Sequence, residues 1–133
     1  MKRPITLIAA GVLLAGPTVL MAAAPAQAEP EKHARGTVAG ARYDISVEKE
    51  RGRFDADADL EGVAAGSRWK MVVRHDGRRV GARTARAVRD DGRFEVDFRE
   101  VRSADTAGRD VFKVTLKRTD GAGKVTRKLV FRR

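Results

Sequence analysis

The chain has three aspartates at alternate positions, Asp55, Asp57 and Asp59. Carboxylates so close in sequence are candidate calcium ligands. An EF-hand loop starting at Asp55 would need glycine at its sixth position and glutamate at its twelfth. This chain has Leu60 and Gly66 there. On a strand the three side chains would stand about 6.5–7 Å apart, too far to share one ion without ligands from a neighbouring strand. We expect these acids to pair with arginines across strands instead, and we predict no metal site.

Hydrolytic chemistry has equally little support. The chain has no cysteine, and no serine lies in the Gly-x-Ser-x-Gly turn of hydrolases. Only two histidines occur, and His75, beside Asp76-Gly77, is expected to be exposed at the end of a hairpin. A small domain whose aromatic rings all face inward offers no cleft to hold a sugar. The sequence therefore predicts a protein that is not an enzyme and has no cofactor.

The elements that must position any site are strands, because apolar and polar residues alternate with period two. Tyr43, Ile45 and Val47 show the pattern, with polar residues between them. Asp-Gly and Arg-Gly pairs, typical of tight hairpin turns, fall between such runs. Seven short strands are predicted, over 43–47, 54–60, 69–73, 80–88, 94–98, 112–116 and 129–131. Their number and spacing predict an all-β fold, a single antiparallel seven-stranded β-sandwich over residues 37–133.

Particular residues of this pattern resemble those of immunoglobulin-like and fibronectin type III-like sandwiches. Trp69 lies on the third strand, where an immunoglobulin core tryptophan would lie, and Phe112 opens the sixth strand, where a corner tyrosine is common. Val114 and Ala56 or Ala58 fall where the family's cysteines would be. The resemblance implies an architecture and no catalytic residue. The chain also resembles small arginine-rich secreted sandwiches of high-GC bacteria.

In that architecture the first, second and fifth strands share one sheet, and the third, sixth and seventh share the other. Acidic residues then face outward on the first sheet, although arginines are mixed with them. Basic residues alone, Lys124 among them, are charged at the outward strand positions of the second sheet. The predicted anion-facing patch consists of Lys70, Arg74, Lys113, Lys117, Lys128 and Arg132.

Two interpretations of this patch remain open. It can dock on an anionic cell-envelope polymer or an acidic protein, or it can keep the domain soluble and protect a sheet edge. Nucleic acid is disfavoured except as a sequence-independent polyanion, because no aromatic ring is left outside for bases to stack on. A second hypothesis is an inhibitor or accessory subunit of a secreted enzyme, acting through loops 61–67, 88–92 and 119–124. Faces of opposite charge could also stack copies head to tail.

The first 28 residues have the three-part layout of a secretory signal peptide. A basic start precedes an apolar run over 5–24 and a small-x-small cleavage site that ends at Ala28. A run of about 20 apolar residues could also serve as a membrane anchor, but its prolines and the cleavage site favour removal. Removal of Lys2 and Arg3 would lower the formal net charge from +10 to +8. We expect a secreted or cell-wall-associated protein with no transmembrane segment after cleavage, and a flexible lead over 29–36.

Overall fold

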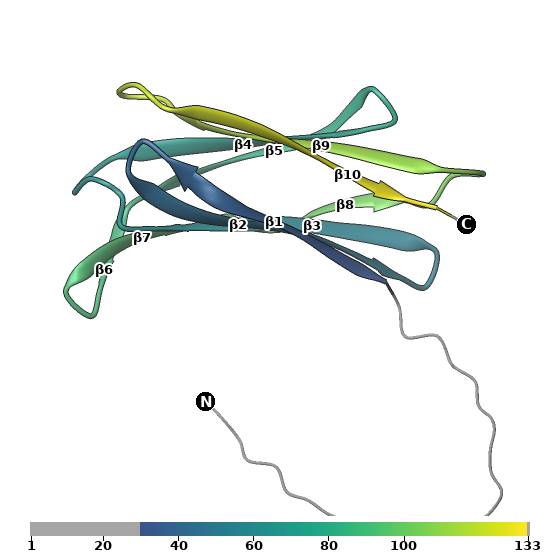
Figure 1. Cartoon of the computed structure of the whole chain (residues 1–133), viewed down its shortest axis with the longest axis horizontal. Helices are drawn as coiled ribbons and strands as arrows, with labels where there is room; N and C mark the ends of the chain where they lie inside the picture. Colours follow the sequence, from purple (N-terminus) through teal and green to yellow (C-terminus); the bar gives the residue numbers. More distant parts are fainter. Residues whose placement is uncertain (1–29, 133) are drawn as a thin grey trace, which may run out of the picture.

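The computed structural model describes residues 30–132, and all its regular elements in that range are β-strands (Figure 1). The expected signal peptide, residues 1–28, lies outside the described residues. Within the described part of the chain, no helix is long and apolar enough to cross a membrane. The ten strands are β1 (Glu31–Val38), β2 (Ala41–Glu50), β3 (Arg53–Glu61), β4 (Arg68–His75), β5 (Arg78–Arg86), β6 (Val88–Asp90), β7 (Arg93–Asp97), β8 (Val101–Ala104), β9 (Asp110–Arg118) and β10 (Lys124–Phe131).

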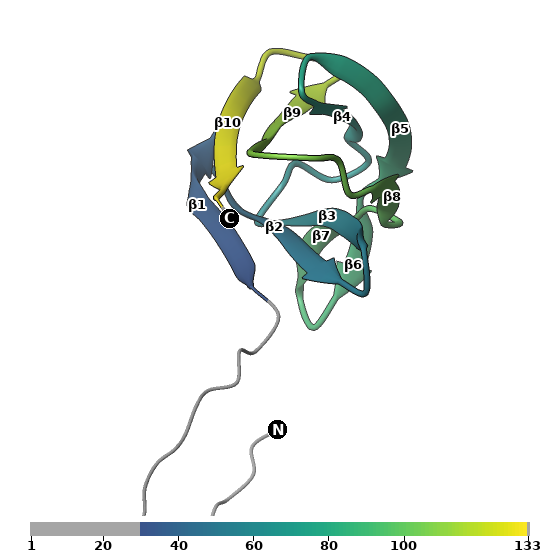
Figure 2. The same ribbon diagram turned by 90° about the vertical axis from the view of Figure 1, so that its right-hand side faces the viewer.

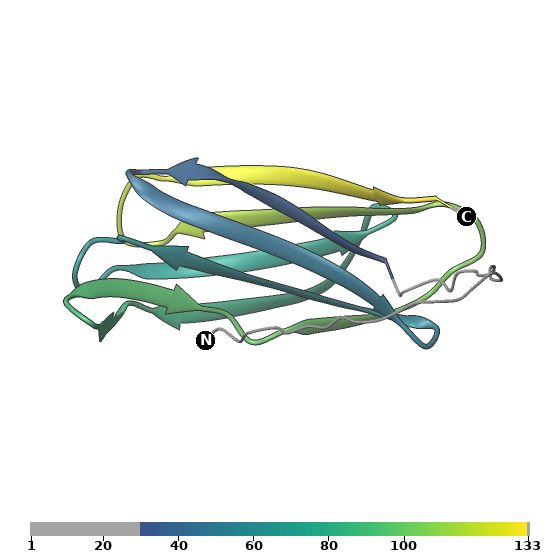
Figure 3. The ribbon, with the colours of Figure 1, turned by 60° about the horizontal axis from the view of Figure 1, so that its bottom comes forward.

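Two antiparallel sheets make up the fold, as predicted. The first has the order β1-β2-β3-β7-β6, with β8 also paired to β3, and the second has the order β10-β9-β4-β5. The strands run along the long axis of the molecule (Figure 3). The sheets approach each other at both sides, where β1 lies beside β10 and β5 beside β8 (Figure 2). Arg127 of β10 joins them on one side, donating to the Arg35 carbonyl oxygen (3.2 Å) and to the Tyr43 hydroxyl (2.6 Å).

The core lies between the two sheets and is filled from both by every second residue. Full burial of a large apolar side chain contributes about 1.5–3 kcal/mol, so this layer dominates stability. The prediction that all seven aromatic residues face inward is confirmed: six are buried, and Phe94 packs partly buried against the same core. The largest fully buried side chains are Trp69, Phe54, Phe112, Ile45, Leu60 and Met71.

Two of the three Asp-Gly pairs make the expected tight turns. Asp76 and Asp91 have φ of 52°, and the glycine after each also has positive φ, the combination of a type I′ hairpin turn. Asp120-Gly121 differs, because β9 and β10 are joined by a longer loop. There the Asp120 carboxylate accepts hydrogen bonds from the Arg68 N–H and from Arg118 Nε.

The seven-strand count and the flexible lead are both wrong. Residues 31–36, expected in the lead, form most of β1, which pairs with β2 along its whole length. The apolar alternation is weak there because Lys32 and Gly36 occupy inward positions, and a Cβ on Gly36 would lie 2.7 Å from the Tyr43 hydroxyl. The weak strand over 80–88 becomes β5 and the three-residue β6, and β8 was not predicted.

Candidate anion-binding face

The outward side of the second sheet carries its lysines and arginines in ordered rows. Inward residues of β4, β9 and β10 fill the core, so the residues between them must face outward. Antiparallel pairing then brings outward residues of neighbouring strands side by side. The six cations at these positions form the Lys70 row (Lys70, Lys117, Lys124) and the Arg74 row (Arg74, Lys113, Lys128). Together these six residues are called the basic face below.

The spacing of the two rows follows from strand geometry. Cations within a row are on neighbouring strands, about 5 Å apart at the backbone, and the rows are four residues apart along a strand, or about 13 Å. An uncharged row of Val72, Thr115 and Thr126 lies between them. The Thr115 and Thr126 hydroxyls are hydrogen-bonded to each other at 2.8 Å. The basic face is therefore a ladder with two charged edges and a neutral centre.

None of the six cations makes an ion pair with any residue in the part of the chain that the structure describes. Five of them are exposed and Lys70 is half-buried. Like charges directly opposite each other destabilise a sheet by about 0.2–1 kcal/mol a pair. An anion bridging a row would relieve this repulsion, so the face is suited to bind one.

The structure places five of the six predicted patch residues in these rows. Arg132 follows the end of β10, beyond its last paired residue, and belongs to neither row. Lys124 was expected among the outward basic residues of this sheet but was not included in the predicted patch. The register of the hairpin sets Lys124 opposite Lys117 and so makes it part of the Lys70 row. Arg79 of β5 lies opposite Arg74 and extends that row.

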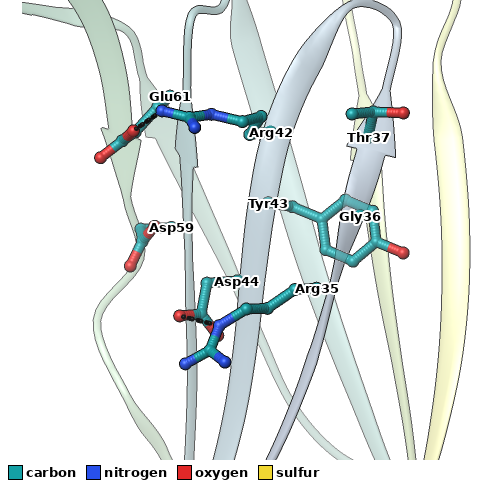
Figure 4. Close-up of a pocket in the computed structure, with 8 residues that line it drawn as sticks. All are labelled: Arg35, Gly36, Thr37, Arg42, Tyr43, Asp44, Asp59 and Glu61. Carbon is teal, nitrogen blue, oxygen red and sulfur yellow. Dashed lines mark hydrogen bonds and ion pairs between the residues drawn. The ribbon is translucent and has the colours of Figure 1, made fainter.

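The first sheet is different, because most of its outward charges are paired. Arg35 binds Asp44 (3.1 Å) and Arg42 binds Glu61 (2.8 Å). These two ion pairs line a hollow of about 480 Å³ on the outside of this sheet (Figure 4). The expected pairing with arginines across strands holds for Asp55, whose Oδ1 lies 3.6 Å from Arg102 Nε on β8, but not for Asp57 or Asp59. The outward arginines of β1, β2 and β3 thus have acidic partners, whereas the cations of the basic face have none among the described residues.

Asp59 is one of several outward acids of the first sheet that make no ion pair among the described residues. It lies directly between Asp44 and Asp97 across three strands, and it makes no ion pair or hydrogen bond with a side chain of the described residues. Partial burial, followed by the charges of Asp44 and Asp97, raises the pKa of Asp59 to about 6. The folded protein therefore holds this proton more tightly than the unfolded chain does. Consequently, the contribution of Asp59 makes the free energy of unfolding fall as pH rises from about 4 to about 6.

We predict that Asp59→Asn removes this pH-dependent loss. The amide cannot ionise, so at pH 7.5 the variant is expected to be more stable than the wild type by about 1 kcal/mol, a figure reduced for solvent screening. At pH 4.5 the difference should shrink to a few tenths of a kcal/mol. Urea unfolding of both proteins at the two pH values measures this. A variant equally or less stable at pH 7.5 would contradict the prediction.

The three predicted contact loops lie at one end of the sandwich, the left-hand end in Figure 1. Loop 88–92 is β6 with the turn after it. It carries Val88, 65% exposed and the one large apolar side chain so exposed among the described residues. Val88 thus gives this end of the sandwich a small exposed apolar contact point that lies outside the basic face.

His75 is not exposed, contrary to the expectation from its position beside a turn. Its ring is 4% exposed, stacks on Phe112 at 4.2 Å and contacts the edge of Phe54. Its nitrogens meet Ser103 Oγ (2.6 Å) and Asp110 Oδ1 (2.7 Å), residues 28 and 35 positions later in the sequence. Local sequence pattern carries no signal for contacts at such separations.

No family model, curated protein or solved structure was found to match the chain. The residues of the chain itself therefore carry the functional inference.

Proposed function

We propose that the protein is a secreted, non-enzymatic binding module that docks its basic face on an anionic polymer of the cell envelope. The observation that carries the proposal is the two rows of unpaired cations at regular spacing on the second sheet. Secretion is supported by the signal-like layout of residues 1–28. Because a secreted protein meets partners outside the cytoplasm, we propose a partner at the cell wall or outside the cell.

The edge of β10 supports binding over a purely protective role for these lysines. Lysines often guard an exposed strand edge against pairing with another sheet. Here β10 has β1 beside it, and Arg127 bridges the two strands (Figure 2). The edge is thus already covered, and four of the six cations, all except Lys124 and Lys128, are on the inner strands β4 and β9. Edge protection explains little of the basic face.

An immunoglobulin-like architecture is the scaffold that fits this proposal. The order β2-β3-β7-β6 follows the A-B-E-D sheet of that family, and β10-β9-β4-β5 follows its G-F-C sheet with a C′ strand added. Strands β1 and β8 are additions to this scheme. Since such scaffolds serve many functions, the basic face and not the scaffold supports the binding role.

The chemistry of the face favours a flexible polyanion as partner. Bases of single-stranded nucleic acid need aromatic side chains to stack on, and the described aromatic residues all pack into the core. Lysine and arginine rows bind phosphate or carboxylate groups without regard to sequence. A polymer with charges repeated along a chain can follow one row or cross between both.

A salt series of binding to a purified poly(glycerol phosphate) wall polymer tests the proposal, with heparin as a sulfated comparison. If the six cations each contact one charge, log Kd should change with log salt with a slope of about 4, from the counterion release of flexible chains. Binding should then weaken by about 10²-fold between 50 and 200 mM salt. No binding at 50 mM would overturn the proposal.

A second candidate function uses the loops at one end of the sandwich instead of the basic face. There Val88 and the loops 61–67 and 119–124 could contact a secreted enzyme, as an inhibitor or an accessory subunit would. An acidic protein could also use the basic face. Stoichiometric retention of a protein, with no retention of the polymer, would favour these alternatives.

A further inference from the structure

The buried His75 belongs to a polar cluster at the end of the sandwich away from the predicted contact loops. The cluster joins the Asp76-Gly77 turn between β4 and β5 to the connection between β8 and β9. Both lie at the right-hand end of Figure 1, where the C-terminus lies. We propose that the cluster is a binding site for a divalent transition-metal ion of the Zn²⁺ class, held by His75, Asp76 and Asp110. The proposal is independent of the basic face.

The donor atoms already converge. His75 Nε2 donates to Asp110 Oδ1 at 2.7 Å and lies 3.6 Å from Asp76 Oδ2. Thr106 Oγ1 lies 3.0 Å from Asp76 Oδ2 and 2.8 Å from Asp110 Oδ1, so it adds a fourth donor atom, the third oxygen. Zinc bonds to nitrogen and oxygen are about 2.0–2.2 Å, which sets ligands of a tetrahedral site about 3.4 Å apart. The histidine–Asp76 separation is close to this value, and the histidine–Asp110 separation must open by about 0.7 Å.

The supporting contacts are those of a metal ligand set. Ser103 Oγ lies 2.6 Å from His75 Nδ1, so when Nε2 binds an ion, Nδ1–H can donate to that oxygen. The stacked Phe112 ring fixes the plane of the imidazole. Asp76 is held by its other oxygen, Oδ1, which accepts the Val111 N–H at 2.8 Å. Its Oδ2 is thereby aimed into the cluster.

Burial and charge agree with this role. The side chains of His75 and Asp110 are 3% and 2% exposed, whereas that of Asp76 is 36% exposed and leaves a path from solvent. Burial raises the pKa of Asp110, but hydrogen bonds from Thr106 and His75 outweigh it, and the net shift is downward. Two carboxylates and an imidazole match the charge and the ligand preference of Zn²⁺, whereas Ca²⁺ and Mg²⁺ prefer oxygen alone.

Ser103, His75 and Asp110 are also the residue types of a hydrolytic triad. In such a triad serine contacts Nε2 and aspartate contacts Nδ1, and here the two contacts are reversed. The convergence of Asp76 and Thr106 on the Nε2 side has no role in that chemistry. It is accounted for by an ion at Nε2.

The test is a titration of the purified, EDTA-stripped protein with Zn²⁺, followed by calorimetry and thermal unfolding. We expect one ion per chain and a rise in Tm of about 10 °C at a hundredfold excess over Kd. The key variant is Asp76→Asn, because its Oδ1 can still accept the Val111 N–H while the anionic ligand is lost. Its affinity should fall by more than the roughly 10–100-fold that follows loss of a supporting hydrogen bond.

Two further variants complete the test. Ser103→Ala removes the partner of Nδ1 and should weaken Zn²⁺ binding by about 10–100-fold. Asp91→Asn is the matched control, since Asp91 has the same φ of 52° before a glycine in another hairpin turn. It should bind Zn²⁺ as the wild type does. Absence of a Tm shift in the wild type, or equal shifts in Asp76→Asn and Asp91→Asn, would overturn the proposal.

Discussion

Replacing Lys113 and Lys117 by glutamate is expected to abolish polymer binding while making the protein more stable. Each lysine lies in the middle of its row, with a cation on the neighbouring strand at either side. Six cations become four cations and two anions, so the charge of the basic face falls from +6 to +2. Binding at 50 mM salt should weaken by about 10²–10³-fold, and the slope with log salt should fall to about 1.

The gain in stability comes from the same geometry. Each new glutamate faces two cations across the sheet, and opposite charges at such positions contribute about 0.2–1 kcal/mol a pair. After allowance for solvent, the free energy of unfolding should rise by about 1 kcal/mol. A misfolded variant would lose both binding and stability, so weaker binding together with a higher free energy of unfolding cannot result from misfolding.

The matched control changes the total charge by the same amount away from the basic face. Arg89 and Arg99 are exposed and make no ion pair within residues 30–132, so Arg89→Glu/Arg99→Glu leaves both rows intact. Surface plasmon resonance with the immobilised polymer, and urea unfolding, compare the two double variants. If both weaken binding equally, the rows have no special role and the positive charge acts only through its total.

The rows could be anticipated because they depend on period and register alone. Alternation in β4 and β9 fixes which side Lys70, Arg74 and Lys113 face. The division of strands between the sheets followed from the predicted sandwich and agrees with the structure. Lys124 was also expected to face outward, and its place in the Lys70 row follows from the hairpin register that sets it opposite Lys117.

What could not be anticipated depends on contacts between segments distant in sequence. β1 shows no clear alternation, since Gly36 is an inward residue selected by the neighbouring Tyr43 ring and not by burial of its own side chain. The short β8 is defined only by its pairing with β3. His75 was expected to be exposed because it lies beside a turn. It is buried because Ser103 and Asp110, which are distant in sequence, contact its ring. The candidate metal site was therefore invisible in the sequence.

Asp110→Ala is expected to cause the largest loss of stability of any single change proposed. Its carboxylate is 2% exposed and accepts hydrogen bonds from His75 (2.7 Å), Thr106 Oγ1 (2.8 Å) and the Thr106 N–H (3.4 Å). Its removal leaves the buried donors of His75 and Thr106 without an acceptor, which costs about 1–3 kcal/mol for each unsatisfied group. The variant should lose most of the margin of a domain whose total stability is about 5–15 kcal/mol.

Asp110→Asn separates the lost charge from the lost hydrogen bonds. The carbonyl oxygen of the asparagine can still accept a hydrogen bond from Thr106 or from His75. This substitution should therefore lower the free energy of unfolding by only about 1–2 kcal/mol, the cost of a buried polar group that is imperfectly paired. Urea unfolding of the ion-free proteins at pH 7 measures both, with an unchanged m-value showing that the unfolded states are comparable. An alanine variant within 1 kcal/mol of the wild type would mean that the β4–β5 turn and the β8–β9 connection are held together by core packing. A large loss for alanine with a smaller one for asparagine would instead show that the hydrogen bonds of Asp110 hold the end of β4 and the β8–β9 connection together.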